Sequence, residues 1–427
     1  MLTLYKIFTM ILYYISLPVI FPAYLAGSLK WGHRLGYGYK PCDRQGCQLW
    51  LHASSMGEVK VMGILIGQLR KIDPNLSLYI TVMTDTGYQS ALDLVSKNTA
   101  VGYIPLDSRP AINRFLKTVN PARAAFIETE IWPNIITALG HRRIPVFLAN
   151  GRLSEKAAGR YRLVRSGLGR VFEQYTAMMV QSEEDRERFI SVGARLDGID
   201  VLGNLKFDAP MTRLSDERIR ELKNSLPFGV KAKLFIAGST RGGENEIIIN
   251  VFKKLAGEFP DVRLILVPRH LERVGSIRLL CDTAQVKYRL FSQEGITKDD
   301  PMILVVDSMG VLNDLYSVSD IAFVGGTLVD IGGQNILEPV WAGIPVLYGP
   351  SIFNVRDSSA YITGGRFGKM VTDGDDLYRH LVGYFRGELT FRTKNRNEDE
   401  NSRAFQTARK ILGPAVADGK TVADNNQ

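Results

Sequence analysis

Short apolar runs alternate with amphipathic stretches along nearly the whole chain, and this alternation restricts the fold more than any other feature. The pattern is typical of parallel sheets covered by helices. In the first half the predicted strands are Gln48–Ala53, Leu76–Val82, Ala100–Ile104, Ala124–Ile127, Pro145–Ala149, Ala177–Val180 and Asp200–Leu202. The stretches between them predict helices, for example Val59–Lys71, Arg109–Thr118 and Glu183–Val192.

A polar stretch of helix-favouring residues, 212–225, interrupts this alternation. Strands are then predicted again at Leu234–Ala237, Val262–Val267, Ile303–Asp307, Ile321–Val324 and Pro345–Leu347. We therefore expect an α/β protein of two doubly wound, Rossmann-like domains that face each other across a cleft, with ligands at the carboxyl ends of the strands. The expected parts are a hydrophobic membrane anchor at 1–30, an N-terminal domain at 31–211, a linker at 212–229, a C-terminal domain at 230–412 and a flexible tail at 413–427.

The composition is that of a globular protein kept in a reducing compartment. With 45% hydrophobic and 23% charged residues over 427 positions, the chain has none of the polar bias of disordered or fibrous proteins. The three cysteines, Cys42, Cys47 and Cys281, are too few for a disulfide framework and lack the spacing of a zinc site. They are therefore expected to be reduced thiols facing the cytoplasm.

Positive charge is concentrated in the first half of the chain. The net charge is +9, and residues 1–200 contain 24 Lys and Arg against 16 Asp and Glu. This asymmetry indicates an anionic partner for the first half, such as a phosphorylated lipid, a membrane surface or nucleic acid. General solubility charge is the alternative, and nucleic acid is disfavoured because no basic-aromatic motif accompanies the charge.

The N-terminal segment resembles a membrane anchor. Ile7–Leu29 contains no charged residue and is long enough to span a bilayer, although two prolines are expected to interrupt its helix. Lys30, Arg34 and Lys40 follow and would keep the rest of the chain cytoplasmic. A secretory signal peptide is the alternative, but Lys6 is the only preceding charge and the cleavage site is poorly defined. We expect an uncleaved anchor, either spanning or re-entrant.

Two loops at predicted strand ends of the first half contain acidic residues. Glu58 follows a glycine at the start of a helix, where it is either a first-turn acid that suits the helix dipole or a carboxylate in the cleft. Glu128 and Glu130 lie two residues apart before Pro133 and would share a face in extended chain. One of them suits a helix cap, and the other a general base or an acceptor of a substrate hydroxyl.

The second half contains a candidate nucleotide site. Glycines before a helix can present amides to phosphate, and an acid a few residues later can bind ribose hydroxyls. The loops at consecutive strand ends are Gly238-Ser239-Thr240-Arg241, Pro268-Arg269-His270, Asp307-Ser308-Met309-Gly310, Val324-Gly325-Gly326 and residues 332–339.

Other nucleotide and metal motifs are missing or have a simpler explanation. The chain has no GxxxxGK[ST] sequence, which argues against a P-loop NTPase. Asp373-Gly374-Asp375 matches a metal-binding D-x-D pattern, but capping of the following helix explains it better. His52 and His270 follow strands, and a structural role is expected for each.

These motifs occur together in one family. HASSMGE, VMTDTGYQSA, ETEIWPN, GNLKFD, AGSTRGGE, PRHLER and GGTLVDIGGQNILEPV, in this order, resemble 3-deoxy-D-manno-octulosonic acid (Kdo) transferases, and the resemblance extends from residue 1 to about residue 412. It implies a glycosyltransferase of the B-type fold that moves Kdo, with inversion, from CMP-Kdo to the tetraacylated, bisphosphorylated lipid A precursor. It also implies lipopolysaccharide biosynthesis at the cytoplasmic side of the inner membrane, with no cofactor and no metal.

The resemblance also assigns roles to residues. It implies that Glu58 is the proton acceptor and that Glu130 and Lys206 stabilise the transition state. The residues that it implies for CMP are Pro268, Arg269, Met309, Gly310, Val311, Asn335, Ile336, Leu337 and Glu338, with Glu338 on the ribose. Met56 and Gln334 depart from the family pattern, which affects fine specificity and not the activity class.

The acceptor site rests on charge alone. A basic run could contact lipid phosphates, or it could be a solvated helix face: Arg152, Lys156, Arg160, Arg162, Arg165 and Arg170. The alternatives to a Kdo transferase are a B-fold enzyme that uses a UDP-sugar, as transferase or epimerase, and a catalytically silent membrane-bound scaffold. The sequence predicts neither the oligomeric state nor the number of Kdo residues added.

Overall fold

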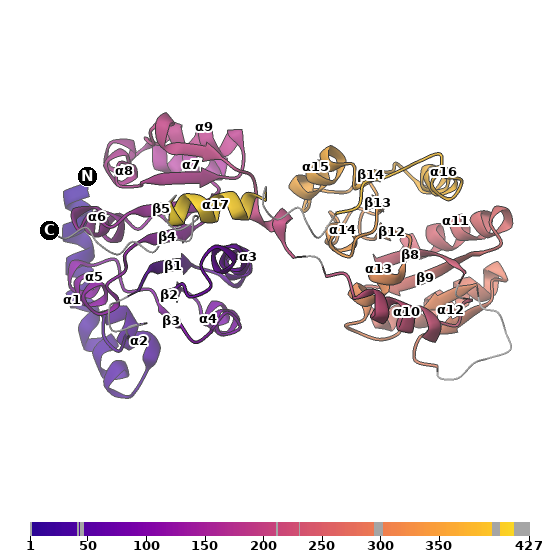
Figure 1. The fold of residues 1–427 in the computed structure, drawn as a ribbon, viewed down its shortest axis with the longest axis horizontal. Helices are drawn as coiled ribbons and strands as arrows, with labels where there is room; N and C mark the ends of the chain where they lie inside the picture. The colour runs from indigo at the N-terminus through magenta and orange to yellow at the C-terminus, as the bar shows by residue number, and fades with distance from the viewer. Residues whose placement is uncertain are drawn as a thin grey trace. The chain divides into compact units, whose positions relative to one another are not determined.

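The structure is a computed structural model that describes residues 2–40, 42, 47–210, 212–229, 231–293, 302–394 and 402–413. It divides into two compact units, residues 1–209 with 399–427 and residues 210–398. Each unit contains one seven-stranded sheet in which every pair of neighbouring strands is parallel, with helices packed on its faces (Figure 1). The predicted α/β fold with two doubly wound sheets is confirmed.

The first sheet has the strand order β3-β2-β1-β4-β5-β6-β7. Its strands are β1 (Leu49–Ala53), β2 (Leu78–Val82), β3 (Thr99–Tyr103), β4 (Ala124–Ile127), β5 (Val146–Gly151), β6 (Ala177–Val180) and β7 (Ile199–Val201). All seven predicted strands form, because their apolar side chains are buried on both faces of the sheet. The order reverses between β1 and β4, and a ligand crevice is expected beyond the carboxyl ends of these two strands.

Helices cover both faces of the first sheet. They are α2 (Leu29–Leu35), α3 (Met56–Ile72), α4 (Asp85–Leu92), α5 (Arg109–Val119), α6 (Pro133–His141), α7 (Glu155–Arg162), α8 (Arg165–Phe172) and α9 (Glu183–Ser191), with the short 3-10 turns η1 (Leu196–Gly198) and η2 (Leu205–Asp208). One apolar cluster lies under α5, α6, α8 and α9 and another under α3, so the sheet is the middle of three layers.

The second sheet has the order β10-β11-β9-β8-β12-β13-β14, with its reversal between β8 and β12. Its strands are β8 (Lys233–Thr240), β9 (Val262–Pro268), β10 (Tyr288–Leu290), β11 (Ile303–Val305), β12 (Ile321–Val324), β13 (Val346–Tyr348) and β14 (Gly368–Met370). The five predicted strands form. The sequence analysis missed β10 and β14, which are three-residue strands at the two edges of the sheet and lack an apolar run.

The helices of the second unit are α10 (Asp216–Ser225), α11 (Glu244–Glu258), α12 (Val274–Ala284), α13 (Leu312–Val318), α14 (Glu338–Trp341), α15 (Arg356–Gly365) and α16 (Gly374–Phe385), with the turn η3 (Leu271–Arg273). The stretch expected to be a linker, 212–229, is part of this unit. Its helix α10 packs on α13, and Leu226 and Phe228 after it are buried in the core.

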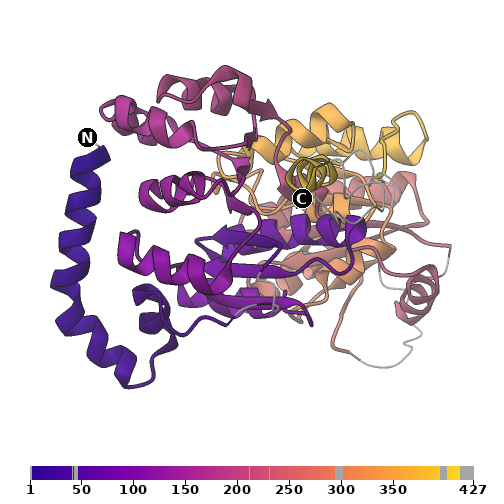
Figure 2. The same ribbon diagram turned by 60° about the vertical axis from the view of Figure 1, so that its left-hand side comes forward.

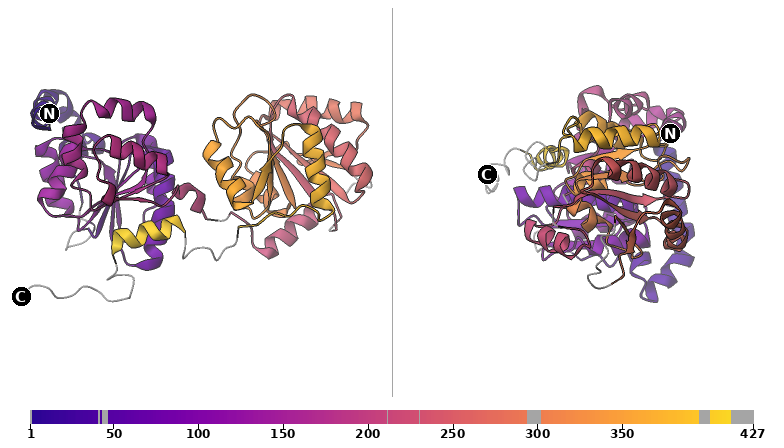
Figure 3. Two further views of the ribbon diagram at one scale, coloured as in Figure 1. Left: turned by 90° about the horizontal axis from the view of Figure 1, so that it is seen from above. Right: turned by 90° about the vertical axis from the view of Figure 1, so that its right-hand side faces the viewer.

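The C-terminal helix α17 (Arg403–Leu412) belongs to the first unit, whereas the sequence analysis ends the second domain at residue 412. It packs on α3, as Figure 3 shows, and its residues Ala404 and Ile411 are buried in the core of the first unit. Arg403 pairs with Asp208 at 3.0 Å. An amphipathic helix needs an apolar surface to cover, and α3 provides it. Most of the expected flexible tail, residues 414–427, lies outside the described residues.

The N-terminal helix α1 (Leu2–Leu25) lies beside α2 and α5 (Figure 2). By length and composition it could cross a membrane. The helix continues through Pro18 and Pro22, where an interruption was expected. A proline removes only one intrahelical hydrogen bond, and the other bonds of this long helix maintain it. Tyr13 faces the unit and is buried, whereas most of the apolar side chains of α1 are exposed.

Candidate functional site

Glu58 lies in the first turn of α3, directly beyond the carboxyl end of β1. Its carboxylate accepts hydrogen bonds from the Ser54 backbone N–H at 2.8 Å and from Ser55 Oγ at 2.9 Å. Ser55 in turn caps the helix by accepting from the Glu58 N–H. Burial raises the pKa of Glu58 above its ordinary value, and the neighbouring Glu130 adds to the rise. The result is a carboxylate with a fixed orientation and increased basicity.

Glu130 follows β4, the other strand at the reversal of the sheet. Its Oε2 accepts from Trp132 Nε1 at 2.7 Å and lies 3.3 Å from Nε2 of the fully buried His52. Burial alone would raise the pKa of Glu130, but the contacts with His52, Ser54 and Trp132 outweigh it and hold the pKa below the ordinary value. The other ring nitrogen of His52, Nδ1, lies 2.9 Å from the Thr81 carbonyl oxygen and 3.0 Å from Thr81 Oγ1. His52 thus contacts Glu130 from a buried position, which suits the structural role expected for it.

Glu128 has a different environment from its neighbour. Its backbone is in the left-handed region, with φ at 62°, which is strained for a residue with a side chain. Burial, and after it the charge of Glu58, raises the pKa of Glu128 to about 7, although Arg152 opposes the rise. The strand end thus holds a carboxylate that is ionised at neutral pH, Glu130, beside two whose pKa values are raised. Such separation of pKa values within one cluster is typical of acid–base sites.

Lys206 lies at the same end of the first sheet, in the turn η2, which packs against α3. Its side chain is exposed, and its backbone N–H donates to Asn204 Oδ1 at 2.9 Å. Asn150, at the end of β5, accepts from the Leu205 N–H at 2.9 Å, and Gln181 links Asn150 to Asn204. This polar network fixes the turn and leaves the ammonium group free to contact an anion.

The basic run lies on α7, on α8 and in the loop before α7, and all six of its cationic side chains are exposed. Arg162 is paired with Glu155 at 2.9 Å, so its charge is partly neutralised. Between the two helices, Leu163 is 80% exposed. A single exposed leucine is common on protein surfaces, so lipid phosphates and a solvated helix face both remain open for this run.

In the second unit, the amides of the glycine-rich loop after β12 are already occupied. The Glu244 side chain is fully buried and accepts hydrogen bonds from the backbone N–H groups of Gly326 at 2.7 Å and of Thr327 and Leu328 at 3.0 Å each. It also accepts from the Arg241 N–H at 2.8 Å. The amides of residues 326–328 are therefore unavailable to a phosphate.

Two other loops at the carboxyl edge present unpaired amides. Within the described part of the chain, nothing accepts from the backbone N–H groups of residues 309, 310, 311, 335 and 336. Gly310 has φ at 84°, which favours glycine there. The side chains of Ile336 and Leu337 are fully buried, so these two residues can contact a ligand only through the backbone.

The remaining predicted donor residues lie at the same edge of the second sheet. Pro268 ends β9, and the exposed Arg269 follows it, with its N–H donating to Thr240 O at 3.0 Å. Glu338 begins α14, and its Oε1 accepts from Asn335 Nδ2 at 3.1 Å. Asp373 caps α16 by accepting from the Asp376 N–H at 2.8 Å, which confirms capping as the explanation of the D-x-D match.

Comparison with known proteins identifies the family. The sequence profile described as "3-Deoxy-D-manno-octulosonic-acid transferase (kdotransferase)" matches residues 29–209. A 3-deoxy-D-manno-octulosonic acid transferase of Haemophilus influenzae is 34% identical over 320 residues, which cover 74% of this chain and 74% of the relative. The chain belongs to the Kdo transferase family.

Two further similarities concern the extent of the chain and its fold. A bifunctional glycosyltransferase/methyltransferase of Fusobacterium nucleatum is 36% identical over 358 residues, which cover 83% of this Kdo transferase family member and 54% of the relative. The chain thus spans about half the length of that relative. The crystal structure of UDP-GlcNAc 2-epimerase from Neisseria meningitidis bound to UDP-GlcNAc superposes with a TM-score of 0.54 at 15% identity, over 86% of this chain and 98% of that one. This likeness shows the shared fold alone.

Sequence reasoning missed the partners of the family motifs. His52, Glu128 and Glu244 belong to the motifs, but their contacts are with residues distant in sequence. His52 contacts Glu130, and the charge of Glu58 acts on Glu128. Glu244 binds the amides of residues 326–328. The sequence gives no signal for Glu244, because its burial and its four donors appear only in the fold.

Replacing Glu128 by Gln should stabilise the first unit at alkaline pH. The folded-state pKa of about 7 exceeds the ordinary glutamate value, so the folded state binds more protons and the wild type loses stability as pH rises through 7. Gln cannot ionise, and at pH 8 the variant should gain on the order of 3 kcal/mol, with no gain near pH 4. Thermal unfolding at the two pH values measures this. The exposed Glu187→Gln is the control, and an equal gain at both pH values would contradict the assignment.

Proposed function

We propose that the chain transfers Kdo from CMP-Kdo to the tetraacylated lipid A precursor in lipopolysaccharide biosynthesis, at the cytoplasmic side of the inner membrane. Family membership supports the sugar that is transferred. The observation that carries the mechanism is Glu58, a carboxylate with a raised pKa, held by Ser54 and Ser55 at the reversal point of the first sheet.

In the proposed reaction Glu58 takes the proton from the primary hydroxyl of the distal glucosamine of the acceptor. The hydroxyl oxygen forms a bond to the anomeric carbon of Kdo, and the bond from that carbon to the phosphate oxygen of CMP breaks. CMP leaves with the electron pair from the opposite face of the sugar, so the anomeric configuration inverts. No metal or other cofactor is needed to balance these steps.

Glu130 and Lys206 stabilise charge in this scheme. Glu130, ionised through its contacts with His52 and Trp132, lies where positive charge develops on an oxocarbenium-like sugar. Lys206 supplies positive charge to the departing phosphate or to the Kdo carboxylate.

CMP-Kdo is assigned to the carboxyl edge of the second sheet. The unpaired N–H groups of 309–311 and 335–336 suit phosphate and carboxylate oxygens, and the exposed Arg269 adds a positive charge. Glu338 suits the ribose hydroxyls, since a carboxylate accepts two hydrogen bonds from a diol. Pro268 and Leu337 are buried, so they would contribute to this site through their backbone.

The acceptor phosphates are assigned to the basic run on α7 and α8. The double variant Arg160→Ala/Arg162→Ala should raise the acceptor KM by up to about thirtyfold and leave the donor KM unchanged, because each cation contributes roughly 1 kcal/mol to binding an anionic lipid surface. Steady-state kinetics with each substrate varied in turn measures the two constants. The exposed Arg195→Ala in the same unit is the control. An unchanged acceptor KM would remove α7 from the site.

The test of the function is transfer of Kdo from freshly generated CMP-Kdo to the tetraacylated precursor, read by mass spectrometry. A Kdo mass increment supports the proposal, and the number of increments shows how many residues are added. The rival is a UDP-sugar enzyme of the same fold. That rival predicts two results: UDP-sugars, but not CMP, protect the second unit against thermal unfolding, and no Kdo increment is found. Both results together would overturn the proposal.

A further inference from the structure

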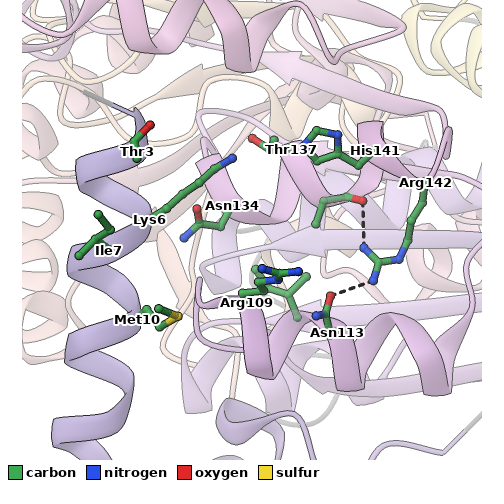
Figure 4. Close-up of a pocket in the computed structure, with 12 residues that line it drawn as sticks. Thr3, Lys6, Ile7, Met10, Arg109, Asn113, Asn134, Thr137, His141 and Arg142 are labelled. Atoms are coloured by element: carbon green, nitrogen blue, oxygen red, sulfur yellow. Dashed lines mark hydrogen bonds between the residues drawn. The ribbon is translucent and has the colours of Figure 1, made fainter.

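A pocket separate from the sheet edges lies between α1 and the helices α5 and α6 (Figure 4). Its volume is about 640 Å³. Three contacts fix α1 at this place: Tyr5 OH donates to Asp107 at 2.8 Å, Asn134 Nδ2 donates to Thr9 Oγ1 at 2.9 Å, and Arg114 donates to Tyr13 OH at 2.7 Å. The pocket therefore lies between helices of the first unit that these hydrogen bonds hold together.

Positive charge dominates the polar part of the lining. Lys6 enters from α1, Arg109 from the first turn of α5, and Arg142 from the end of α6, and no lining residue is acidic. Among the described residues, Lys6 and Arg109 have no hydrogen-bond or ion-pair partner for their side chains. Arg142 is oriented by donating to Asn113 Oδ1 at 2.8 Å and to the Ala138 carbonyl oxygen at 3.1 Å.

Asp107, two residues before Arg109, is held within the fold and does not line the pocket. Its side chain is buried and accepts from Tyr5 OH and from the backbone N–H groups of Asn134 and Ile135. Its hydrogen-bonding capacity is therefore taken up within the fold. Two cations without partners, next to a third that is already oriented, form a site for a phosphate group.

Apolar side chains also line the pocket, among polar ones such as Thr137 and His141, and they adjoin the helix that could enter a membrane. Ile7, Met10 and Ile112 line the pocket, and Figure 4 shows Met10 on the side of α1 that faces Arg109. On α1 itself, the neighbouring Phe8 and Ile11 are more than half exposed. A ligand in this pocket thus meets positive charge and hydrocarbon together, at the edge of an apolar helix face that suits the interior of a bilayer.

We propose that this pocket binds the phosphate headgroup of an anionic glycerophospholipid, with the start of its acyl chains against Ile7 and Met10. The bound lipid would join α1 to α5 and α6 and hold the first unit against the membrane. The inference does not depend on the transfer reaction, because it concerns retention of a membrane lipid and not turnover.

The experiment measures lipids retained by the full chain. The protein is equilibrated in detergent with equal amounts of phosphatidylglycerol and phosphatidylcholine, and bound lipid is counted by native mass spectrometry. The wild type should retain phosphatidylglycerol in preference to phosphatidylcholine. Lys6→Ala/Arg109→Ala should reduce its retention by about tenfold or more, since each cation near an anionic headgroup is worth roughly fivefold in affinity.

Two further variants separate this pocket from general charge and from misfolding. Lys117→Ala removes an exposed cation from the same helix α5 outside the pocket and should leave retention unchanged. Arg109→Lys keeps the charge and should restore most of the retention. Equal retention of the two lipids, an equal loss in Lys117→Ala, or displacement of phosphatidylglycerol by inorganic phosphate alone would each overturn the proposal, the last by showing that free phosphate is the ligand.

Discussion

Glu58→Gln should abolish Kdo transfer almost completely while leaving the fold intact. A positioned general base contributes about 10²–10⁴-fold to a rate, and glutamine cannot take a proton from the acceptor hydroxyl. Glutamine can still accept from the Ser54 N–H and place its amide toward Ser55 Oγ, so the start of α3 should persist. We expect kcat to fall at least a hundredfold with little change in either KM or in the melting temperature.

The control for this variant tests the alternative that Glu58 only complements the helix dipole. Glu217 is an exposed first-turn acid of α10, and Glu217→Gln removes the same charge from the same kind of position. A dipole contribution is worth about 0.3–1 kcal/mol, which affects stability and not turnover. If Glu58→Gln retained more than about a tenth of the wild-type kcat, Glu58 would not be the base.

The pH dependence of the wild type provides a second check. Only the ionised form of Glu58 can accept a proton, so kcat/KM should fall on the acid side as Glu58 is protonated. Since the pKa of Glu58 is raised, this fall should begin at a higher pH than an ordinary glutamate gives. A rate that stays constant down to the ordinary glutamate range would contradict the assignment.

Most of the fold could be predicted from the sequence because parallel strands are buried on both faces. Such strands are mostly apolar, as β1, β2 and β4 are. The helices between them have one polar and one apolar face, so the two kinds of element are easily distinguished in the sequence. The two missed strands, β10 and β14, have three residues each and lie at the edges of the second sheet. Their residues are only partly buried, so they show no apolar run in the sequence. The position of α17 could not be predicted either, since its apolar face fits a helix more than three hundred residues away in the chain.

The candidate site was predictable as far as local sequence determines it. A glutamate at a helix start and acids after a strand are visible in the letters, and the fold then brings Glu58 and Glu130 to the same reversal point. The contact between His52 and Glu130 cannot be read from the sequence, because it joins a residue of β1 to one in the loop after β4, and only the folded sheet brings these two strands together. The raised pKa of Glu128 likewise depends on burial and on a charge from another loop.

The glycine-rich loop after β12 shows that clustered backbone amides can bind a carboxylate of the protein itself. Glycines at a strand end do indicate close backbone approach: a Cβ at Gly325 would lie 2.5 Å from the Thr240 Cα. The anion that the following amides bind is nevertheless the carboxylate of Glu244, from within the same unit. Phosphate and carboxylate satisfy clustered N–H groups equally well, and only the tertiary structure distinguishes them.

Glu244→Ala should therefore destabilise the second unit strongly. The substitution leaves four backbone N–H groups without an acceptor, those of Arg241, Gly326, Thr327 and Leu328. An unsatisfied buried donor costs about 1–3 kcal/mol, and partial access of water reduces the total, so we expect a loss on the order of 4 kcal/mol. For a unit of this size that corresponds to a fall in melting temperature of about 10 °C. Thermal unfolding of the full chain, with hydrogen exchange at residues 326–328, measures it.

Glu246 provides the matched control, because it is exposed in the first turn of the same helix α11. Glu246→Ala should change the melting temperature by less than about 2 °C, since a surface acid contributes little. Glu244→Gln should be nearly as harmful as the alanine variant, because its amide group would face N–H groups that need an acceptor. If Glu244→Gln were as stable as the wild type, the carboxylate would not be what holds this loop.

With the loop loosened, the neighbouring amides of residues 335 and 336 would lose their fixed direction, and the donor KM should rise in any variant that still folds.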